Sequence, residues 1–173
     1  RVYGTGFKVR YKDATYYLTN RHVCMAIKGL KGKPLSSITI DGNVESILAM
    51  DSRHDICLVK CTNCSGGLKL ASSYNIDEKI VLIGHPRGQN RTFREGRIVT
   101  KGSRLFNWLP MPFMRSFLKI SAIAYPGNSG SPVVNKWGNV VGILFAGDRA
   151  YHTEAYVVPL EEVVKFLSRY INE

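Results

Sequence analysis

Short apolar segments rich in Val, Ile, Tyr, Phe and Thr recur along the chain and are separated by clusters of Gly, Asn, Asp and Pro. Segments of this composition favour β-strands, and the clusters between them favour turns. In the first third of the chain the pattern predicts strands at 2–11, 14–20, 37–40, 44–50 and 56–60, with a short helical turn at 21–27. The sequence Asp41-Gly42-Asn43 joins two of these segments and is typical of a hairpin. We therefore expect one small antiparallel barrel in this part of the chain.

A second β-rich part follows a polar stretch rich in Ser, Asn and Gly. Near the end of the sequence the spacing of apolar residues changes from that of strands to that of a helix. Apolar side chains at 160, 163, 164, 167, 170 and 171 predict an amphipathic helix that docks on a sheet. Pro159 opens this helix, where its missing N–H loses no hydrogen bond. The 173 residues are thus predicted to form one domain of the all-β class with a C-terminal α-helix. Its expected parts are a first lobe at about 1–64, a linker at about 65–77, a second lobe at about 78–158 and the helix at 159–172.

The most distinctive motif is Tyr125-Pro126-Gly127-Asn128-Ser129-Gly130-Ser131-Pro132. A serine held between glycines suits a nucleophile on a tight turn. Gly127 allows its own N–H and that of Ser129 to point at one spot, as the donors of an oxyanion hole do. Gly130 leaves room for a substrate chain above the hydroxyl. The alternative interpretation is an ordinary surface turn that joins two strands.

A serine hydroxyl needs a base, and the base needs a group that orients it. Two upstream segments supply them. His22 ends a β-rich run in Thr-Asn-Arg-His-Val, and Asp55 directly precedes the apolar strand Ile-Cys-Leu-Val. Taken singly, His22 would suit a structural role and Asp55 would suit the cap of a turn.

Four other residues are weaker candidates for the same chemistry. His54 is an alternative base, but it occupies the wrong place in the motif. His85 and His152 lie in predicted loops, so we expect them to be non-catalytic. Ser131 is the other serine of the turn, but the glycine-flanked Ser129 fits the nucleophile pattern.

The motifs Thr-Asn-x-His-Val, Asp-Ile-x-Leu-Val and Pro-Gly-Asn-Ser-Gly-Ser-Pro, in this order, resemble those of the trypsin-like serine proteases of the PA clan. The resemblance extends in particular to the HtrA/Deg and glutamyl-endopeptidase branches. It implies two antiparallel six-stranded-type β-barrels, the chymotrypsin fold, in a single trypsin-like protease domain. It also implies a catalytic triad of His22, Asp55 and Ser129, with an oxyanion hole at Gly127, Asn128 and Ser129. The expected activity is that of a serine endopeptidase, which cleaves peptide bonds through an acyl-enzyme.

The resemblance also places the pocket for the P1 side chain of a substrate. The implied walls are Ile123, Ala124 and Tyr125 on one side and Leu144, Phe145, Ala146 and Gly147 on the other. The backbone near Phe145 is expected to pair with the substrate as an added strand. Glutamyl endopeptidases carry a histidine and a hydroxyl where this chain has Leu144 and Ala124, so we expect a small or medium apolar P1 residue. Glu154 lies near this pocket by alignment and would oppose that preference.

The formal net charge is +11, and one basic cluster follows the predicted strand between Arg91 and Lys101. Such charge attracts nucleic acid, anionic membranes or acidic proteins. We keep nucleic-acid binding as an alternative role. The apolar segment from Leu105 to Met114 contains two prolines and predicts a loop. It either packs on its own lobe or binds a regulatory partner, and the comparable loop of HtrA-like proteases helps to switch the active site.

Composition also bears on membrane insertion, on the state of the cysteines and on the location of the protein. No stretch approaches eighteen consecutive apolar residues, so no membrane span is expected. Cys57 is interpreted as a small core residue, whereas Cys61 and Cys64 form a lone CxxC for which a zinc clip is the alternative to reduced thiols. Reduced thiols favour an intracellular location, in the cytoplasm, the nucleus or the host cell of a virus. No cofactor or metal is expected.

The biological setting stays open at this stage. An active enzyme of this type fits either a quality-control protease or a viral or phage polyprotein protease. A catalytically silent or partner-activated protease fold that serves as a binding module is the main alternative. The chain begins at Arg1 in a segment that looks like the inside of a domain, and another strand normally precedes this point in the proteases that it resembles. We therefore expect a fragment of a longer protein.

Overall fold

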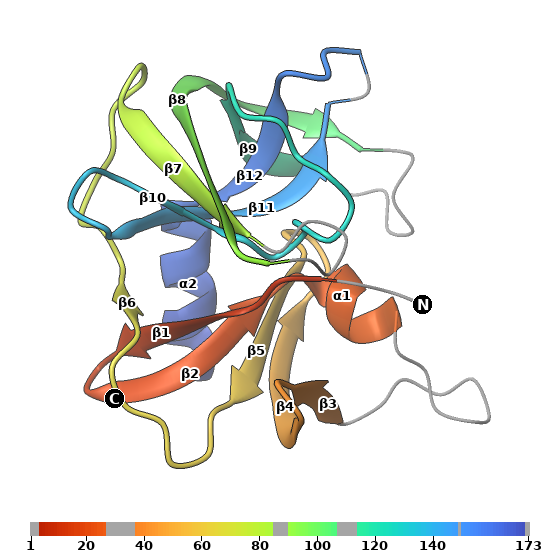
Figure 1. Cartoon of the computed structure of the whole chain (residues 1–173), viewed down its shortest axis with the longest axis vertical. Helices are drawn as coiled ribbons and strands as arrows, with labels where there is room; N and C mark the ends of the chain where they lie inside the picture. The colour runs from red at the N-terminus through yellow and green to blue at the C-terminus, as the bar shows by residue number, and fades with distance from the viewer. Residues whose placement is uncertain (1–3, 27–36, 85–89, 107–113, 149, 172–173) are drawn as a thin grey trace.

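A computed structural model describes residues 4–26, 37–84, 90–106, 114–148 and 150–171 (Figure 1). Strands dominate both halves. The first half contains β1 (Phe7–Tyr11), β2 (Ala14–Thr19), α1 (Arg21–Ala26), β3 (Ser37–Ile40), β4 (Asn43–Asp51), β5 (Ile56–Lys60) and β6 (Leu68–Lys69). The second half contains β7 (Lys79–Gly84), β8 (Thr92–Leu105), β9 (Met114–Ile120), β10 (Pro132–Val134), β11 (Val140–Gly147), β12 (Ala155–Pro159) and α2 (Leu160–Tyr170).

The strands of the first half form a six-stranded sheet in the order β3-β4-β5-β2-β1-β6. Neighbours pair antiparallel, except that β6 runs parallel to β1. Apolar side chains such as Val9, Leu18 and Leu58 are fully buried beneath it. The short helix α1 follows β2 after a single residue, Asn20, so the end of β2 fixes where the helix begins.

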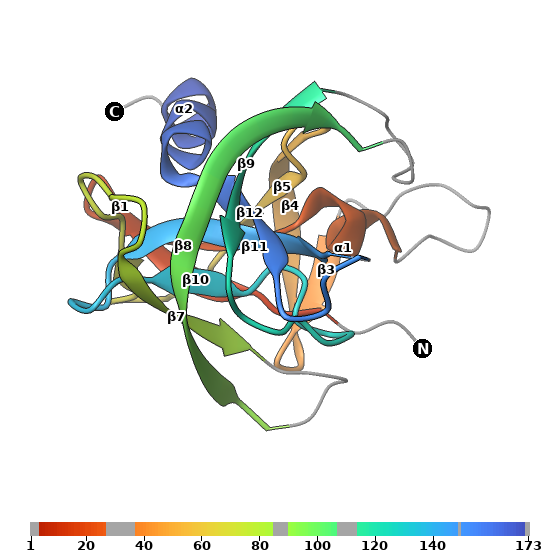
Figure 2. The ribbon, with the colours of Figure 1, turned by 90° about the horizontal axis from the view of Figure 1, so that it is seen from above.

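The strands of the second half close into a barrel in the order β10-β11-β12-β9-β8-β7. Its interior is apolar, with Ile80, Leu118, Val133 and Val157 among the buried residues. Figure 2 shows β8 as a long arched ribbon (green) along this barrel. The barrel is therefore a packed core, and any substrate has to bind at its rim or on its outer face.

A second apolar cluster connects the halves and the C-terminal helix. It contains Val9 and Leu58 from the first sheet, Phe145 from the barrel, and Phe166 and Leu167 from α2. Removal of this apolar surface from water provides the main force that holds the halves together. The site predicted by the sequence lies where they meet.

The structure confirms the predicted fold class: a mostly β protein with two six-stranded halves and a C-terminal helix. Over the described residues the first six strands form a sheet with edges at β3 and β6, whereas only the second six form a ring. The predicted linker contains the short strand β6, because Val9 and Arg10 offer a free edge to Leu68 and Lys69. The helix begins at Leu160, with Pro159 as its N-cap.

The expectation of reduced thiols is wrong in this structure, because all four cysteines form disulfides. Cys24 joins Cys57 and Cys61 joins Cys64. Cys57 is buried as expected, but it is a crosslink between β5 and α1. Among the described residues, no group of three or more side chains is placed to hold a metal ion. The intracellular location stays a prediction.

Candidate active site

His22 and Asp55 are in direct contact. The His22 backbone N–H donates to Asp55 Oδ1 over 2.8 Å, and His22 Nδ1 lies 2.5 Å from Asp55 Oδ2. We assign Nδ1 as the donor, because an ionised carboxylate only accepts hydrogen bonds. The Asp55 side chain is 7% exposed and that of His22 is 36% exposed. The buried carboxylate thus orients a half-exposed imidazole whose Nε2 is left as an acceptor.

Asp55 takes up this position through an unusual backbone. Its φ is 60°, in the left-handed region that non-glycine residues rarely adopt. The buried Asn20 stabilises this conformation by donating from Nδ2 to the Asp55 carbonyl over 3.0 Å. The preceding turn is closed by Asp51, whose Oδ1 accepts the N–H groups of Arg53 and His54.

The alternative base, His54, faces another part of the molecule. Its Nδ1 lies 3.7 Å from Oε1 of Glu162 on α2. Burial lowers the pKa of His54, although the charges of Glu162 and Asp51 act in the opposite direction. His54 therefore connects a turn to the C-terminal helix, and His22 is the histidine that contacts Asp55.

Ser129 follows a tight turn that spans Tyr125 to Asn128. The Asn128 N–H donates to the Tyr125 carbonyl over 3.0 Å, and Gly127 has a φ of 97°. Pro126 at the second position and a glycine with positive φ at the third define a type II turn. The Asn128 amide is therefore committed to the turn. Among the described residues the amides of Gly127 and Ser129 make no such bond, and they remain the two candidate donors to an oxyanion.

The side chains of Asn128 and Ser131 point away from solvent, toward the end of β7. A Cβ atom built on Gly84 would lie 2.5 Å from Asn128 Oδ1 and 2.5 Å from Ser131 Oγ. Ser131 is fully buried, whereas Ser129 is partly exposed. Of the two serines, Ser129 is thus the one that a substrate can reach.

Two threonines tie the serine turn to the first half of the molecule. The Thr5 hydroxyl donates to the Gly127 carbonyl over 2.7 Å, and the Thr5 N–H donates to the Ser129 carbonyl over 2.8 Å. Thr19 Oγ1 in turn donates to the Thr5 carbonyl over 2.7 Å. Thr19 lies three residues before His22, so these bonds bring the serine turn to the strand that leads to the histidine. Among the described residues, no hydrogen bond joins the Ser129 hydroxyl to His22.

Sequence reasoning missed the roles of Thr5 and Thr19. Gly130 reflects the same contact, because its φ is 93° and a Cβ atom there would collide with the Thr5 carbonyl oxygen and the Thr19 hydroxyl. The signal in the sequence was faint. Thr5 lies between two glycines, and Thr19 begins the motif that contains His22.

The two predicted walls of the P1 pocket do lie close together. A Cβ atom built on Gly147 would be 3.8 Å from the Cβ of Ala124. Ile123 is exposed, and the guanidinium of Arg94 lies 4.6 Å from the centre of the Tyr125 ring. Small side chains thus line the closest approach of the walls.

The side chains of Leu144 and Phe145 are 1% and 2% exposed, so they belong to the core and offer a substrate only their backbone. Ala146 is also buried. β10 pairs with β11 only as far as Ile143, and Leu144 then bonds to Ser131 and Gly130. Beyond this point no described strand covers residues 145–147 on that side. This edge lies beside the serine turn.

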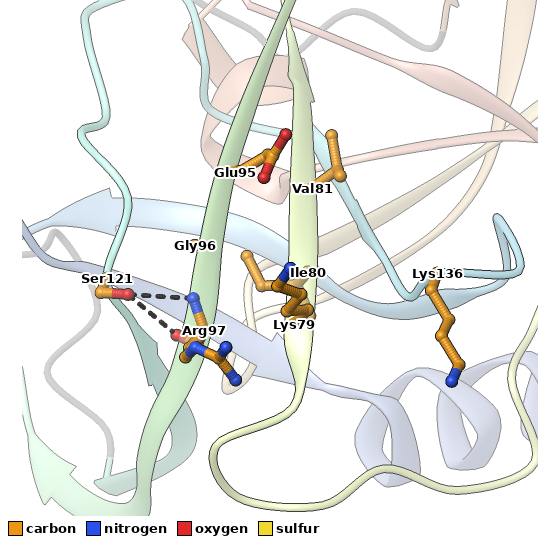
Figure 3. Close-up of a pocket in the computed structure, with 8 residues that line it drawn as sticks. All are labelled: Lys79, Ile80, Val81, Glu95, Gly96, Arg97, Ser121 and Lys136. Atoms are coloured by element: carbon orange, nitrogen blue, oxygen red, sulfur yellow. Dashed lines mark hydrogen bonds between the residues drawn. The ribbon is translucent and has the colours of Figure 1, made fainter.

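Figure 3 shows a separate hollow of about 440 Å³ on the outer face of β7 and β8. Lys79, Arg97 and Lys136 contribute cations, and Ser121 Oγ accepts the Arg97 N–H over 2.9 Å. None of the predicted site residues lines this hollow. Arg97 belongs to the predicted basic cluster between Arg91 and Lys101, and nucleic-acid binding by that cluster stays a prediction.

The segment from Leu105 to Met114 is described only at its ends. Residues 107–113 lie outside the described residues, so the regulatory-partner hypothesis stays a prediction. Phe106 is fully buried and packs edge-on against Phe117, Phe145 and Tyr156. At this residue the segment packs on its own half. Among the described residues, no helix is both long and apolar enough to cross a membrane.

Comparisons with known proteins identify the family and the fold. Residues 4–143 match the family model described as a trypsin-like peptidase domain. The chain is 31% identical over 186 residues to "Serine protease HtrA-like" from Staphylococcus aureus, covering 94% of this chain and 23% of that protein. It is 29% identical over 163 residues to "Probable periplasmic serine endoprotease DegP-like" from Pseudomonas fulva, covering 91% of this chain and 32% of that protein. The chain thus spans about a quarter to a third of these relatives.

Solved structures show the same fold. The active form of a protease from M. tuberculosis superposes with a TM-score of 0.77 at 22% identity, over 96% of this chain and 73% of that one. A serine endoprotease from Yersinia pestis gives 0.72 at 22% identity, over 100% of this chain and 59% of that one. The family model covers most of the chain and shows that it belongs to the trypsin-like peptidase domain family, with proteins of the HtrA and DegP type among its relatives.

Proposed function

We propose that this domain is a serine endopeptidase in which Ser129 is the nucleophile, His22 the general base and Asp55 the orienting carboxylate. One observation carries the proposal. The two hydrogen bonds between His22 and Asp55 fix the imidazole at the place to which Thr5 and Thr19 tie the serine turn. A binding module has no need of this arrangement. The missing Ser129–His22 hydrogen bond does not oppose it, because such bonds are often long before substrate binds.

In the proposed reaction, Ser129 Oγ attacks the substrate carbonyl carbon while His22 Nε2 takes the hydroxyl proton. Asp55 stabilises the imidazolium that forms. The oxyanion accepts hydrogen bonds from the Gly127 and Ser129 amides, and each such donor is worth roughly 10²–10³ in kcat. His22 then returns the proton to the leaving amine. Water then attacks the acyl carbon while His22 Nε2 takes a proton from it, the ester bond to Ser129 Oγ breaks, and His22 returns the proton to Ser129 as the second product leaves.

The substrate is proposed to add as a strand along residues 145–147, where the edge of β11 is uncovered beside the serine turn. Its P1 side chain would lie beside Ala124 and Gly147, whose small size suits a small or medium apolar residue. Glu154, which would oppose this preference, lies 3.6 Å from Lys119 and so has a countercharge.

Covalent labelling with a fluorophosphonate probe tests the function directly. Intact mass should show one label per wild-type molecule and none on Ser129→Ala or His22→Ala. Ser131→Ala is the matched control and should label like the wild type. A folded wild type that takes up no label would contradict the proposal and favour the silent or partner-activated binding module.

A peptide library then tests the P1 preference. We expect cleavage after Ala, Val or Leu to exceed cleavage after Glu, Lys or Phe. A preference for Glu or Lys at P1 would refute the pocket assignment without affecting the triad.

A further inference from the structure

A buried arginine lies behind the candidate site, and the proposed mechanism does not use it. Arg115 is near the start of β9 and is 3% exposed. Among the described residues its Nε and Nη1 have no hydrogen-bond partner, and Nη2 donates only to the Ser52 carbonyl, over 3.4 Å. The guanidinium lies 5.3 Å from the centre of the Phe145 ring. Burying a cation with so few described partners is unfavourable, which makes Arg115 a candidate for a role beyond packing.

The charges around Arg115 come from the other half of the molecule. Burial lowers the pKa of the Arg115 guanidinium, and the carboxylates of Asp55 and Asp51 act in the opposite direction, whereas the charge of Arg21 adds to the effect of burial. Ser52, Asp51 and Asp55 belong to one turn, residues 51–55, between β4 and β5. A cation from the barrel therefore lies against the turn that presents Asp55 to His22.

That turn needs external support. Asp55 has a left-handed backbone, and such conformations persist only where the surroundings hold them. Its two oxygens must meet both the N–H and the Nδ1 of His22, and a displacement of a fraction of an ångström weakens such an arrangement. Asn20 holds the Asp55 carbonyl from one side. Arg115 approaches the same turn from the barrel side, through the Ser52 carbonyl.

We propose that Arg115 is a positioning residue that holds the 51–55 turn so that the Asp55 carboxylate meets both hydrogen-bond donors of His22. The proposal rests on the proposed function, because the His22–Asp55 pair matters only where His22 acts as a base. Arg115 touches neither the substrate nor the reacting atoms. It works through Asp55, and it makes the geometry of the first half depend on a side chain of the second.

The test compares Arg115→Met with Arg104→Met. Arg104 lies directly opposite Arg115 in the β8–β9 ladder, but its described contacts are with the second half: its Nη1 donates to the Tyr156 hydroxyl over 2.8 Å, and its guanidinium lies 4.8 Å from the centre of the Phe106 ring. We expect Arg115→Met to lower kcat about 10- to 100-fold, because a small misplacement of the base has effects of this size. KM should change less than about twofold. Arg104→Met should keep the wild-type kcat, and Arg115→Lys, which retains the charge, should recover part of the loss.

A second readout does not depend on activity. The proton on His22 Nδ1, held by Asp55, should give a separate downfield proton resonance, which His22→Ala assigns by its absence. We expect this resonance to broaden or shift in Arg115→Met and to stay unchanged in Arg104→Met. An unchanged resonance in Arg115→Met, or the same change in both variants, would overturn the proposal.

The two readouts separate this inference from the proposed function. If the wild type shows no Ser129-dependent turnover, the endopeptidase proposal fails and the resonance still decides the role of Arg115. If turnover is present but the kcat of Arg115→Met equals that of Arg104→Met, the positioning role fails and the endopeptidase proposal stands. Thermal unfolding of the three variants shows that each is folded before it is compared.

Discussion

The two halves of the molecule build the candidate site in different ways. The first half supplies a pair of side chains, His22 and Asp55, whose Nδ1 and Oδ2 atoms lie 2.5 Å apart. The second half supplies a backbone shape, which depends on the positive φ of Gly127 and Gly130. A side-chain contact can be removed by an isosteric substitution that leaves the fold intact. A backbone shape cannot change without disturbing its surroundings, so we expect changes in the first half to separate activity from stability and changes in the second to couple them.

The largest separation is expected for Asp55→Asn. An amide in place of the carboxylate favours the wrong histidine tautomer, and kcat should fall about 10⁴-fold. The free energy of unfolding should fall by only about 1–2 kcal/mol, because one accepting oxygen remains. Peptide turnover and urea denaturation measure the two effects. Asp77→Asn, at an exposed position, is the control. If kcat of Asp55→Asn fell by less than tenfold, Asp55 would not be the orienting carboxylate.

The strongest coupling is expected for Gly130→Ala. The new Cβ would meet the Thr5 carbonyl oxygen and the Thr19 hydroxyl. Gly138→Ala is a matched control, because Gly138 also has a positive φ, 80°, but has nothing within 4 Å of its Cβ position. The control should lose about 1–2 kcal/mol of unfolding free energy from backbone strain alone. Gly130→Ala should lose at least about 2 kcal/mol more, as overpacking does, together with most of its activity. Equal losses in the two variants would contradict the predicted collision.

The two disulfides of the first half are expected to differ in their effects on stability and activity. Cys24 and Cys57 each lie two residues beyond a member of the His22–Asp55 pair, and they close a loop of sequence separation 33, whereas Cys61 and Cys64 are separated by 3. Replacing the first pair by serine should lower the free energy of unfolding by about 3–4 kcal/mol, and replacing the second pair by about 2 kcal/mol or less. Activity should fall only with the first pair. Denaturation curves and kcat values of the two double variants test this difference. Equal losses of stability and of kcat in both variants would contradict the idea that the Cys24–Cys57 bond holds α1 in place.

The smallest change in activity and stability is expected for Thr5→Val, which removes a hydrogen bond between the two halves. It removes the hydrogen bond from Thr5 Oγ1 to the Gly127 carbonyl, at about 1 kcal/mol of stability, and should lower kcat about tenfold. Thr15→Val removes a bond of the same length, 2.7 Å, to the Gly66 carbonyl, away from the site. It should lose similar stability and no activity. Equal kcat values for the two variants would show that Thr5 does not shape the serine turn.

Local signals made much of the fold predictable. The strands follow from short β-favouring segments, and α2 follows from apolar spacing after Pro159. The His22–Asp55 contact follows from motifs whose residues have fixed roles. The signals for the strands and for α2 come from residues that are neighbours in sequence, whereas the His22–Asp55 contact spans 33 positions and was expected from the resemblance to a protease family.

Long-range contacts were not predictable in this way. Thr5 bonds to Gly127 across 122 positions, and nothing local distinguishes it from other threonines. Nothing in the local sequence marks Arg115 as buried, yet it is 3% exposed and donates to the Ser52 carbonyl across 63 positions. Cys24 and Cys57 form a pair because α1 packs beside β5, which the spacing of the two cysteines does not reveal. Leu144 and Phe145 were assigned to a pocket wall, but their side chains belong to the core.

The hydrogen bonds of Thr5 also link the active site to relative motion of the two halves. Its amide donates to the Ser129 carbonyl and its hydroxyl donates to the Gly127 carbonyl, and both bonds would break if the halves separated at this point. Assembly of the nucleophile with its base is therefore thermodynamically linked to closure of the domain. The amide proton of Thr5 becomes a natural reporter, since its hydrogen-exchange rate measures how often the site comes apart. A ligand that bridges both halves would slow that exchange by the same factor by which it favours the assembled state.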